Sequence, residues 1–361
     1  MQRIAVIGAG IAGLTVALRR ANAGDQVVLF EAAAQVGGQL ASEERSGLVI
    51  EHGAEGFVAR SEAVPALAVE AGIVDHVVEQ LVQRSFRFDG SQLVELAPGE
   101  AGRLLGFQVP SDELGRGIRS FWHGMAELPE RLASTLGSRV ELRLNSAVAR
   151  ATPRLAGVSL SLEAQENKLD FDGAVIATTA RSAAALLSDA FGAPARALQD
   201  SSLLSSLTVN LAYRREAIAH PLDGTGFIVP DPEQLDGVRA VTFSSSKLPH
   251  RAPASHALLR LFFRPTEHDL RVLSDAAWAE RAARALGRAL PVSGAAEHAV
   301  VSRWPNALPV FDPPHRARIA ALETVLAGQR LWLAGAAFHG SGIDAAIRSA
   351  ESAASAIGGR P

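Results

Sequence analysis

The sequence contains no cysteine, and this absence excludes disulfide bonds, iron–sulfur ligation and thiol catalysis. Basic residues are not in excess, since 35 lysines and arginines stand against 38 aspartates and glutamates. No basic stripe is therefore available to hold nucleic acid. No apolar run reaches the roughly 18 to 20 uninterrupted residues of a membrane-spanning helix. Since no targeting segment is visible, we expect a cytoplasmic protein.

Length and composition are those of a well-packed globular protein. A chain of 361 residues is too long for one small core, so two interleaved domains are expected. Hydrophobic residues make up 48% of the chain and charged residues 20%, which excludes a disordered protein. These values leave the oligomeric state open, a homo-oligomer included.

Residues 3–42 contain a complete dinucleotide-binding unit. Ile4–Ile7 is an apolar run typical of a strand that is buried on both faces of a parallel sheet. Three glycines follow, and each has a different physical role. Gly8 allows a tight turn, Gly10 lets the backbone approach a pyrophosphate, and Gly13 lets a helix pack close to the strand.

A helix and a second strand complete the unit. The helix is predicted from Ile11 to about Ala23, and its first amides are free to hold a diphosphate. The strand Gln26–Phe30 follows and ends at Glu31, where a carboxylate accepts hydrogen bonds from an adenosine ribose. The order of strand, glycines, helix, strand and acid is far more specific than the glycines alone.

Two other interpretations compete for this segment. A signal peptide over Met1–Leu18 is rejected, because three glycines interrupt the apolar core and Arg19 and Arg20 stand where small residues would be cleaved. A nicotinamide-dependent dehydrogenase uses the same fingerprint. Two features further along the chain favour FAD over a nicotinamide.

These features resemble segments of the flavoprotein superfamily that includes the amine oxidases. Val36–Gln39 places a glycine pair beyond the ribose acid, and Ile50–Phe57 resembles the segment that runs beside the isoalloxazine ring. Near the C-terminus, a buried strand predicted over Leu331–Ala337 is followed by Gly340–Asp344 and a helix over 345–356. In that superfamily this helix directs its N-terminal amides at the pyrimidine edge of the flavin.

A closer resemblance, to the protoporphyrinogen oxidase branch of this superfamily, extends over nearly the whole chain. Its segments are HGAEGFVAR (52–60), SSSKLPHRAP (244–253), SRWPNALPVFDPPH (302–315) and AGAAFHGSGIDAAI (334–347). The resemblance implies an α/β fold in which a Rossmann-like FAD-binding domain of the amine oxidase type is interleaved with a mixed-sheet substrate domain. We expect the first domain to comprise 1–84, 120–190 and 325–361, and the second to comprise 85–119 and 191–324.

The fingerprint and the resemblance together imply a set of FAD-binding residues. From the N-terminal half these are Gly8, Gly10, Ile11, Ala12, Gly13, Glu31, Ala32, Gly37, Gly38, Gln39, Gly53, Ala54, Glu55, Gly56 and Val148. From the C-terminal half they are Trp304, Gly335, Ser341, Gly342 and Ile343. Core packing is the competing interpretation for Trp304.

The chemistry implied is hydride transfer from a small-molecule substrate to flavin N5, with dioxygen reoxidising the cofactor. The cofactor carries this chemistry, which explains why no triad, carboxylate dyad or metal cluster is visible. The catalytic residues stay unknown; the weak candidates are His52 and His339, which flank flavin-edge motifs, and Arg103. No metal site is expected, because histidines such as His123 lack a partner at helical spacing. Lys247 is expected to be structural.

A porphyrinogen, which is a tetrapyrrole, is the leading substrate by resemblance. This chain departs from the branch between Leu96 and Phe121, where other members carry a longer helical subdomain that covers the pocket. We therefore expect a more open pocket and no membrane anchor there. The alternatives are a compact oxidase of another substrate (renalase-like, an amine oxidase or a natural-product desaturase) and a catalytically silent flavoprotein.

The local pattern also predicts elements between these motifs. A helix is expected over 62–72 and another over 121–136, with a strand over Arg139–Val148. Hairpins are expected over Phe86–Leu96 and over 158–171.

Overall fold

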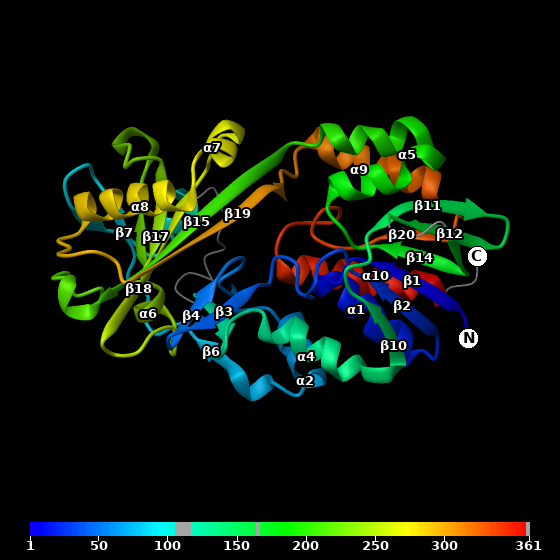
Figure 1. Ribbon diagram of the computed structural model, residues 1–361, viewed down its shortest axis with the longest axis horizontal. Coiled ribbons are helices and arrows are strands. Elements are labelled where there is room, and N and C mark those ends of the chain that lie inside the picture. Colours follow the sequence, from blue (N-terminus) through cyan, green and yellow to red (C-terminus); the bar gives the residue numbers. More distant parts are fainter. Residues whose placement is uncertain (105–116, 164–166, 359–361) are drawn as a thin grey trace.

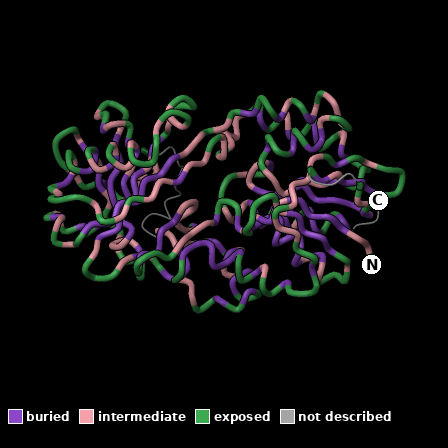
Figure 2. Tube along the Cα trace, viewed as in Figure 1, coloured by how far each residue is buried: buried purple, intermediate pink, exposed green. Residues whose placement is uncertain are grey.

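The computed structural model describes residues 1–104, 117–163 and 167–358. These residues form an elongated molecule with two lobes, each built around its own β-sheet, and the two termini lie at the outer end of one lobe (Figure 1). Buried residues run through the middle of both sheets, while exposed residues lie on the loops and outer helix faces (Figure 2).

The lobe that contains the termini is built on a five-stranded parallel sheet of order β10-β2-β1-β14-β20. Its strands are β1 (Arg3–Ile7), β2 (Gln26–Phe30), β10 (Val140–Arg143), β14 (Gly173–Ile176) and β20 (Leu331–Leu333). Every neighbouring pair is parallel. The apolar runs of β1 and β14 are buried because helices or strands cover both faces of the sheet.

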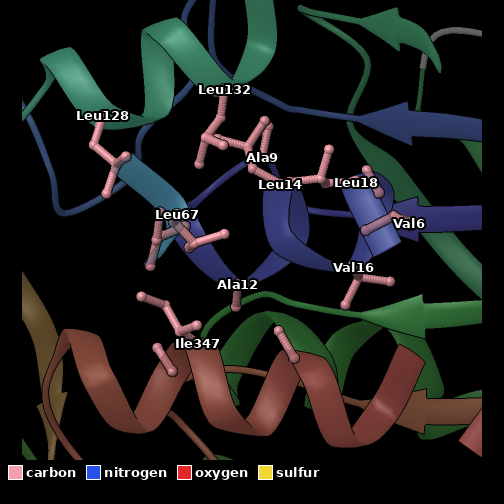
Figure 3. Packing of buried hydrophobic residues seen from close by; sticks show 14 of the residues in the cluster. Val6, Ala9, Ala12, Leu14, Val16, Leu18, Leu67, Leu128, Leu132 and Ile347 are labelled. Atoms are coloured by element: carbon pink, nitrogen blue, oxygen red, sulfur yellow. The ribbon is translucent and has the colours of Figure 1, made fainter. Parts of the chain in front are cut away.

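Four helices pack around one face of this sheet. They are α1 (Ile11–Asn22), α2 (Ala63–Glu70), α4 (Glu127–Leu136) and α10 (Ile343–Gly358). Figure 3 shows α1 at their centre, with Leu67 of α2, Leu132 of α4 and Ile347 of α10 all turned toward it. The first and last helices of the chain therefore share one hydrophobic core.

The opposite face is covered by an antiparallel sheet and two helices. The sheet consists of β11 (Val148–Arg154), β12 (Gly157–Leu162) and β13 (Lys168–Phe171), and the helices are α5 (Ala180–Arg196) and α9 (Pro313–Leu326). Residues of all five elements belong to one buried cluster with β14 and β20.

The second lobe is built on a seven-stranded mixed sheet of order β19-β15-β18-β17-β16-β7-β8. Helix α8 (Asp275–Ala289) covers it through the buried ring of Trp278. The strands are β7 (Phe86–Phe88), β8 (Leu93–Glu95), β15 (Leu203–Arg214), β16 (Gly226–Ile228), β17 (Val238–Thr242), β18 (His256–Phe263) and β19 (His298–Pro309). Because β7 pairs with β16, the chain enters this lobe early, leaves it and returns.

Shorter elements lie between the two sheets or at their edges. Strand β3 (Ser42–Arg45) pairs with β4 (Leu48–Glu51), and β9 (Ile118–Phe121) pairs with both β5 (Phe57–Val58) and β6 (Val77–Glu79). The short helices are α3 (Glu100–Leu104), α6 (Ser244–Lys247) and α7 (Glu267–Val272), with 3₁₀ turns at Val74–His76, Gly137–Arg139, Ala197–Asp200, Arg215–Ala217 and Asp231–Glu233.

The fold class expected from the sequence is confirmed, and so are the first βαβ unit and both hairpins. Three element boundaries were wrong. The strand expected over Leu331–Ala337 ends at Leu333, and Gly335 beyond it has a φ of +112°. The helix expected from 121 begins at Glu127, because Phe121 belongs to β9 and pairs with Val77. The strand expected over 139–148 ends at Arg143, where Asn145 adopts a positive φ of 49° and separates β10 from β11.

The division into two domains stays a proposal, and one of its boundaries moves. Helix α9 was assigned to the substrate domain by its position before residue 325, yet its apolar face lies in the same core cluster as β14 and β20. We therefore propose that the chain returns from the substrate domain to the FAD-binding domain before Pro313, and not at residue 325. Among the described residues, no helix is long and apolar enough to cross a membrane.

Candidate functional site

The turn between β1 and α1 requires glycine at two positions. Gly8 has a φ of +102°, and a Cβ there would lie 2.6 Å from the carbonyl oxygen of Ala177. A Cβ at Gly13 would lie only 1.8 Å from the carbonyl oxygen of Gly8. Both positions are closed to larger residues, so the helix begins directly above the carboxyl ends of the central strands.

Gly10 differs from its neighbours because space lies beside it. It is the N-cap of α1, it has an ordinary φ of −71°, and no side chain caps the helix. A Cβ there would meet nothing closer than the carbonyl oxygen of Gly37 at 3.9 Å. The first amides of the helix, at Ile11 and Ala12, therefore stand at an uncapped N-terminus, which is the arrangement that holds an anion such as a diphosphate.

The glycine pair lies directly against this turn. The amide of Gly37 donates a hydrogen bond to the carbonyl of Ala9 at 2.9 Å, and Gly37 forms an isolated parallel bridge with Gly10. A Cβ at Gly38 would lie 3.5 Å from the Cα of Gly10. The two glycine segments thus form opposite sides of one backbone-lined cradle.

Glu31 is fixed at the end of β2 by two backbone amides. Its Oε2 accepts from Ala9 N at 2.7 Å and its Oε1 accepts from Ala33 N at 2.9 Å. Ala32, the residue between Glu31 and Ala33, is exposed. Each carboxylate oxygen can accept a second hydrogen bond. The side chain is therefore held in place and can still bind the hydroxyl groups of a ribose.

The segment after β4 packs closely on the turn that precedes β3. A Cβ at Gly53 would lie 1.8 Å from the carbonyl oxygen of Gln39, and Ala54 N donates to that same oxygen at 3.0 Å. A Cβ at Gly56 would lie 2.4 Å from the carbonyl oxygen of Arg119. Gln39 also donates from Nε2 to the carbonyl of Ala307 at 2.9 Å, which ties the segment to the second lobe.

The C-terminal motif meets the N-terminal one. Gly335 has a φ of +112°, and a Cβ there would lie 3.3 Å from the Cβ of Ala12. Its amide donates to Ser349 Oγ at 3.0 Å. Ser341 and Gly342 are exposed immediately before α10, whose first residue is Ile343. The start of α10 is joined to the start of α2 by a hydrogen bond from the Ser61 hydroxyl to Asp344.

A group of buried charged side chains contacts the 52–56 segment. Glu55, whose side chain is 9% exposed, forms an ion pair with Lys247 at 2.8 Å and accepts from the Ser244 hydroxyl at 3.0 Å. Burial raises the pKa of Glu55, but the charges of Lys247 and Arg260 and these hydrogen bonds outweigh it and hold the pKa below its ordinary value. This ion pair agrees with the structural role expected for Lys247, which stays a prediction.

Arg260 is the residue at this site that sequence reasoning missed. It is 2% exposed, and its Nη2 donates to the carbonyl of Gly53 at 2.6 Å and to that of His52 at 3.2 Å. Its Nε and Nη1 are buried and have no hydrogen-bond partner within the described residues. A charged residue inside the apolar run HALLRLFF was the available signal, because an arginine is almost never fully buried without a specific role.

A second buried pair lies next to the first. Glu51, which is 3% exposed, accepts from Met125 N at 3.0 Å and faces Arg251 at 3.5 Å. Burial is the largest influence on Glu51 and raises its pKa from 4.5 to about 7, although Arg251 and Ser42 act in the opposite direction. This carboxyl group therefore changes charge near neutral pH.

The weak catalytic candidates occupy different surroundings. His52 Nδ1 lies 2.8 Å from Ser302 Oγ, and burial is the main cause that lowers the His52 pKa. Its carbonyl accepts from Trp304 Nε1 at 2.6 Å. His339 has both ring nitrogens engaged, at 2.7 Å from Ser349 and at 2.7 Å from Glu323.

Two further predicted residues lie on other elements. Arg103 is exposed on α3, immediately before residues 105–116, which lie outside the described part of the chain, and Val148 is half-buried at the start of β11. The structure therefore brings His52 and Trp304 together at the 52–56 segment, and it joins His339 to α9 and α10. The binding and catalytic roles of all these residues stay predictions.

The cradle, the ribose acid and the joined chain ends fit FAD, because Gly10 leaves a space that any side chain would fill and Glu31 is oriented but not saturated. These features define the class: an FAD-dependent oxidoreductase with a Rossmann-like domain. The sequence profile of flavin-containing amine oxidoreductases matches residues 83–358, and an NAD(P)-binding Rossmann-like profile matches residues 6–71. The chain belongs to the flavin-containing amine oxidoreductase family, and FAD is its cofactor.

Comparison with individual proteins shows where in this family the similarity lies. The chain is 21% identical to a coproporphyrinogen III oxidase of Bacillus subtilis (strain 168), across 98% of this chain and 97% of that protein. It is 30% identical to a coproporphyrinogen III oxidase of Propionibacterium freudenreichii subsp. freudenreichii, across 66% of this chain and 45% of that protein. The resemblance to porphyrinogen oxidases is thus confirmed.

The fold is shared with solved structures of other enzymes. Cyclohexylamine oxidase from Brevibacterium oxydans IH-35A superposes with a TM-score of 0.78 at 14% identity, covering 99% of this chain and 98% of that one. The alignment with the Bacillus protein spans 461 positions against 361 residues here, so that relative has at least 100 residues without a counterpart in this chain. That these fall between Leu96 and Phe121 stays a prediction.

Proposed function

We propose that this FAD-dependent enzyme oxidises a porphyrinogen, with coproporphyrinogen III favoured over protoporphyrinogen IX. The single observation that supports this substrate is the near end-to-end similarity to a coproporphyrinogen III oxidase. The geometry of the site supports the redox part of the proposal. The names of the relatives support the choice of substrate.

When bound, FAD would supply the redox chemistry, which is acceptance of a hydride at N5 and reduction of dioxygen to hydrogen peroxide. The chain's own residues bind and orient. In this proposal the α1 N-terminus at Gly10 holds the diphosphate and Glu31 holds the ribose. The start of α10, at Gly342 and Ile343, would face the pyrimidine edge of the ring.

The 52–56 segment is proposed to lie beside the flavin ring. Its backbone is held by Arg260 at the carbonyls of His52 and Gly53, and by the Glu55–Lys247 pair below it. Trp304 adds a third connection at the His52 carbonyl. We propose that these are positioning residues. Arg260 and Trp304 bind the backbone of the segment, and Lys247 binds the carboxylate of Glu55 within it.

Turnover of chemically reduced porphyrinogens tests the proposal. The FAD-loaded full chain is mixed with coproporphyrinogen III, protoporphyrinogen IX, a primary amine and a dihydronicotinamide in separate assays. We expect porphyrin fluorescence to rise above the rate of autoxidation, with three peroxides formed per porphyrin and with coproporphyrinogen III the faster substrate. Each of the three steps moves two electrons and two hydrogens from substrate to dioxygen.

The other assays give the contrary outcomes. Oxidation of the amine or the dihydronicotinamide without any porphyrinogen turnover would assign the enzyme to a different substrate class. A flavin that none of the four compounds bleaches under anaerobic conditions would favour the catalytically silent flavoprotein.

A further inference from the structure

A surface cluster outside the flavin site brings together side chains that are typical metal ligands. His76, His123 and Glu127 each offer one ligand atom, and these atoms all lie within 4.8 Å of one another. His76 ends the 3₁₀ turn Val74–His76, while His123 and Glu127 lie in and just after the loop that joins β9 to α4. The cluster therefore joins segments that are distant in sequence.

Strand pairing brings His76 to His123 and Glu127, which are themselves four residues apart in the sequence. Val77 of β6 pairs with Phe121 of β9, and the amide of Trp122 donates to the carbonyl of His76 at 2.9 Å, so His76 lies beside the residue that precedes His123. Their rings lie 5.9 Å apart in an edge-on arrangement. A search for histidines at i and i+4, as made from the sequence, cannot detect such a pair.

The distances suit a small divalent ion. Zinc binds imidazole nitrogen and carboxylate oxygen at about 2.0–2.2 Å, so two donors at a tetrahedral angle stand about 3.4 Å apart. A largest separation of 4.8 Å therefore closes around zinc with side-chain movements of less than about 1 Å. Two imidazoles and one carboxylate also favour a transition metal over magnesium or calcium, which prefer oxygen ligands alone.

A pocket of about 460 Å³ with an acidic lining surrounds these ligands. The lining carries four carboxylates against one guanidinium, so its charge favours a cation. These five side chains are Glu43, Glu44, Glu127, Glu130 and Arg131. Glu127 is 8% exposed and forms a hydrogen bond with His76 Nδ1, so a carboxylate at the base of the pocket is directed at an imidazole.

Glu44 supplies the outer partner that such sites use. Its Oε1 lies 2.6 Å from His123 Nδ1, which leaves the Nε2 of His123 available. Metal-binding histidines commonly donate their second ring nitrogen to a carboxylate in this way, because the contact fixes the ring and its tautomer.

We propose that His76, His123 and Glu127 bind one Zn²⁺ ion, with Glu44 orienting His123 and water completing the coordination. The ion would join β6, β9 and α4 at a point next to the buried Glu51. Ser42, which lines the pocket, donates its hydroxyl hydrogen to Glu51. Met125, in the loop between β9 and α4, donates its backbone amide to the same carboxylate. The ion would hold the loop that fixes Glu51.

Zinc titration of the chelator-treated, FAD-loaded full chain without a histidine tag tests this proposal. We expect one Zn²⁺ per chain by calorimetry, and visible absorption of a low-coordinate complex when Co²⁺ replaces it. Glu44→Gln should weaken zinc binding by about 10-fold, which is the usual cost of an outer-shell partner. His123→Ala should weaken binding at least as much, and the zinc-induced rise in melting temperature should disappear.

His256→Ala is the matched control. His256 also pairs with a glutamate, Glu297, at 2.8 Å, but it belongs to no group of three ligand side chains among the described residues. The zinc affinity of the His256→Ala protein should equal that of the parent protein. An absence of saturable binding, or equal affinity in Glu44→Gln, His123→Ala and His256→Ala variants of normal flavin content, would show that the cluster is only a set of hydrogen-bonded side chains.

Discussion

Gly10 is the residue at which one added side chain has the most specific expected effect. Because a Cβ there meets no atom closer than 3.9 Å, Gly10→Val should fold, yet its side chain would stand in the proposed path of the diphosphate. We expect purified Gly10→Val to be colourless, with a far-ultraviolet circular dichroism spectrum like that of the parent protein.

A matched substitution separates flavin loss from general damage. Gly287, in α8 of the other lobe, also has no atom near a built Cβ, so Gly287→Val should retain the flavin absorbance. A yellow Gly10→Val protein would contradict the position assigned to the diphosphate.

Glu51 makes stability depend on pH near neutrality. Burial raises its folded-state pKa to about 7, above the ordinary 4.5, so the folded protein binds this proton more tightly than the unfolded chain. The stabilisation is complete below about pH 4.5 and is lost as the pH rises through about 7. Glu51→Gln cannot lose it, because the amide does not ionise.

Denaturant unfolding of both proteins from about pH 5 to about pH 8 measures this effect. The parent protein should lose stability relative to Glu51→Gln across that range, by up to about 3 kcal/mol. Taking the difference between the two proteins cancels the titration of every other group. Parallel pH curves would show that Glu51 stays ionised in the folded protein.

At the scale of elements, the Glu55–Lys247 pair connects the 52–56 segment to α6. The side chains are 9% and 14% exposed, so removing one partner leaves a poorly solvated charge. We expect Lys247→Met to cost about 3 kcal/mol of unfolding free energy, and Glu55→Gln/Lys247→Met to recover part of that loss. Thermal or urea unfolding measures both.

An exposed pair of similar geometry serves as the control. Arg150 lies 2.7 Å from Asp189, but the two side chains are 64% and 68% exposed. Water solvates both groups already, so Arg150→Met should leave stability unchanged within error. If Lys247→Met were equally neutral, the buried pair would not be what holds the segment.

The elements also show what the sequence could and could not predict. The β1–α1–β2 unit was predictable because glycines, an apolar run and an acid follow one another within 40 residues, and each has one local cause. Helix α4 was misplaced because β9 is defined by its pairing with β5 and β6, and no local pattern reports such pairing.

The candidate site divides in the same way. Gly8, Gly13 and Gly53 could be found from sequence, because the close approach of another backbone demands glycine. The role of Arg260 and the proximity of His76 to His123 depend on strand register over long sequence distances. They could be seen only after folding.

At the scale of the whole molecule, the first and last helices share one core. Figure 3 shows α1 enclosed by α10 on one side and by α4 on another, and Gly335 lies against Ala12. A single nucleotide bound at the start of α1 would therefore be held by both ends of the chain. Removing FAD should loosen both ends together.

Hydrogen exchange with and without FAD tests this coupling. With FAD at about 100 times its dissociation constant, openings that release the nucleotide become about 2.7 kcal/mol less favourable, so exchange should slow by about 100-fold. We expect slower exchange both at residues 8–13 and at residues 335–346. Helix α8, which covers the sheet of the other lobe, should be unaffected.

The pattern of protection distinguishes two ways of binding. If FAD were held by the N-terminal unit alone, slower exchange would be confined to residues 8–13 and 37–39, and α10 would respond only where it packs on α1. If both ends hold the nucleotide, residues 340–343 should also be protected, because they precede and begin α10 and lie outside the shared core cluster except at Ile343. Unchanged exchange at 340–342 would therefore contradict the proposal that the start of α10 faces the flavin.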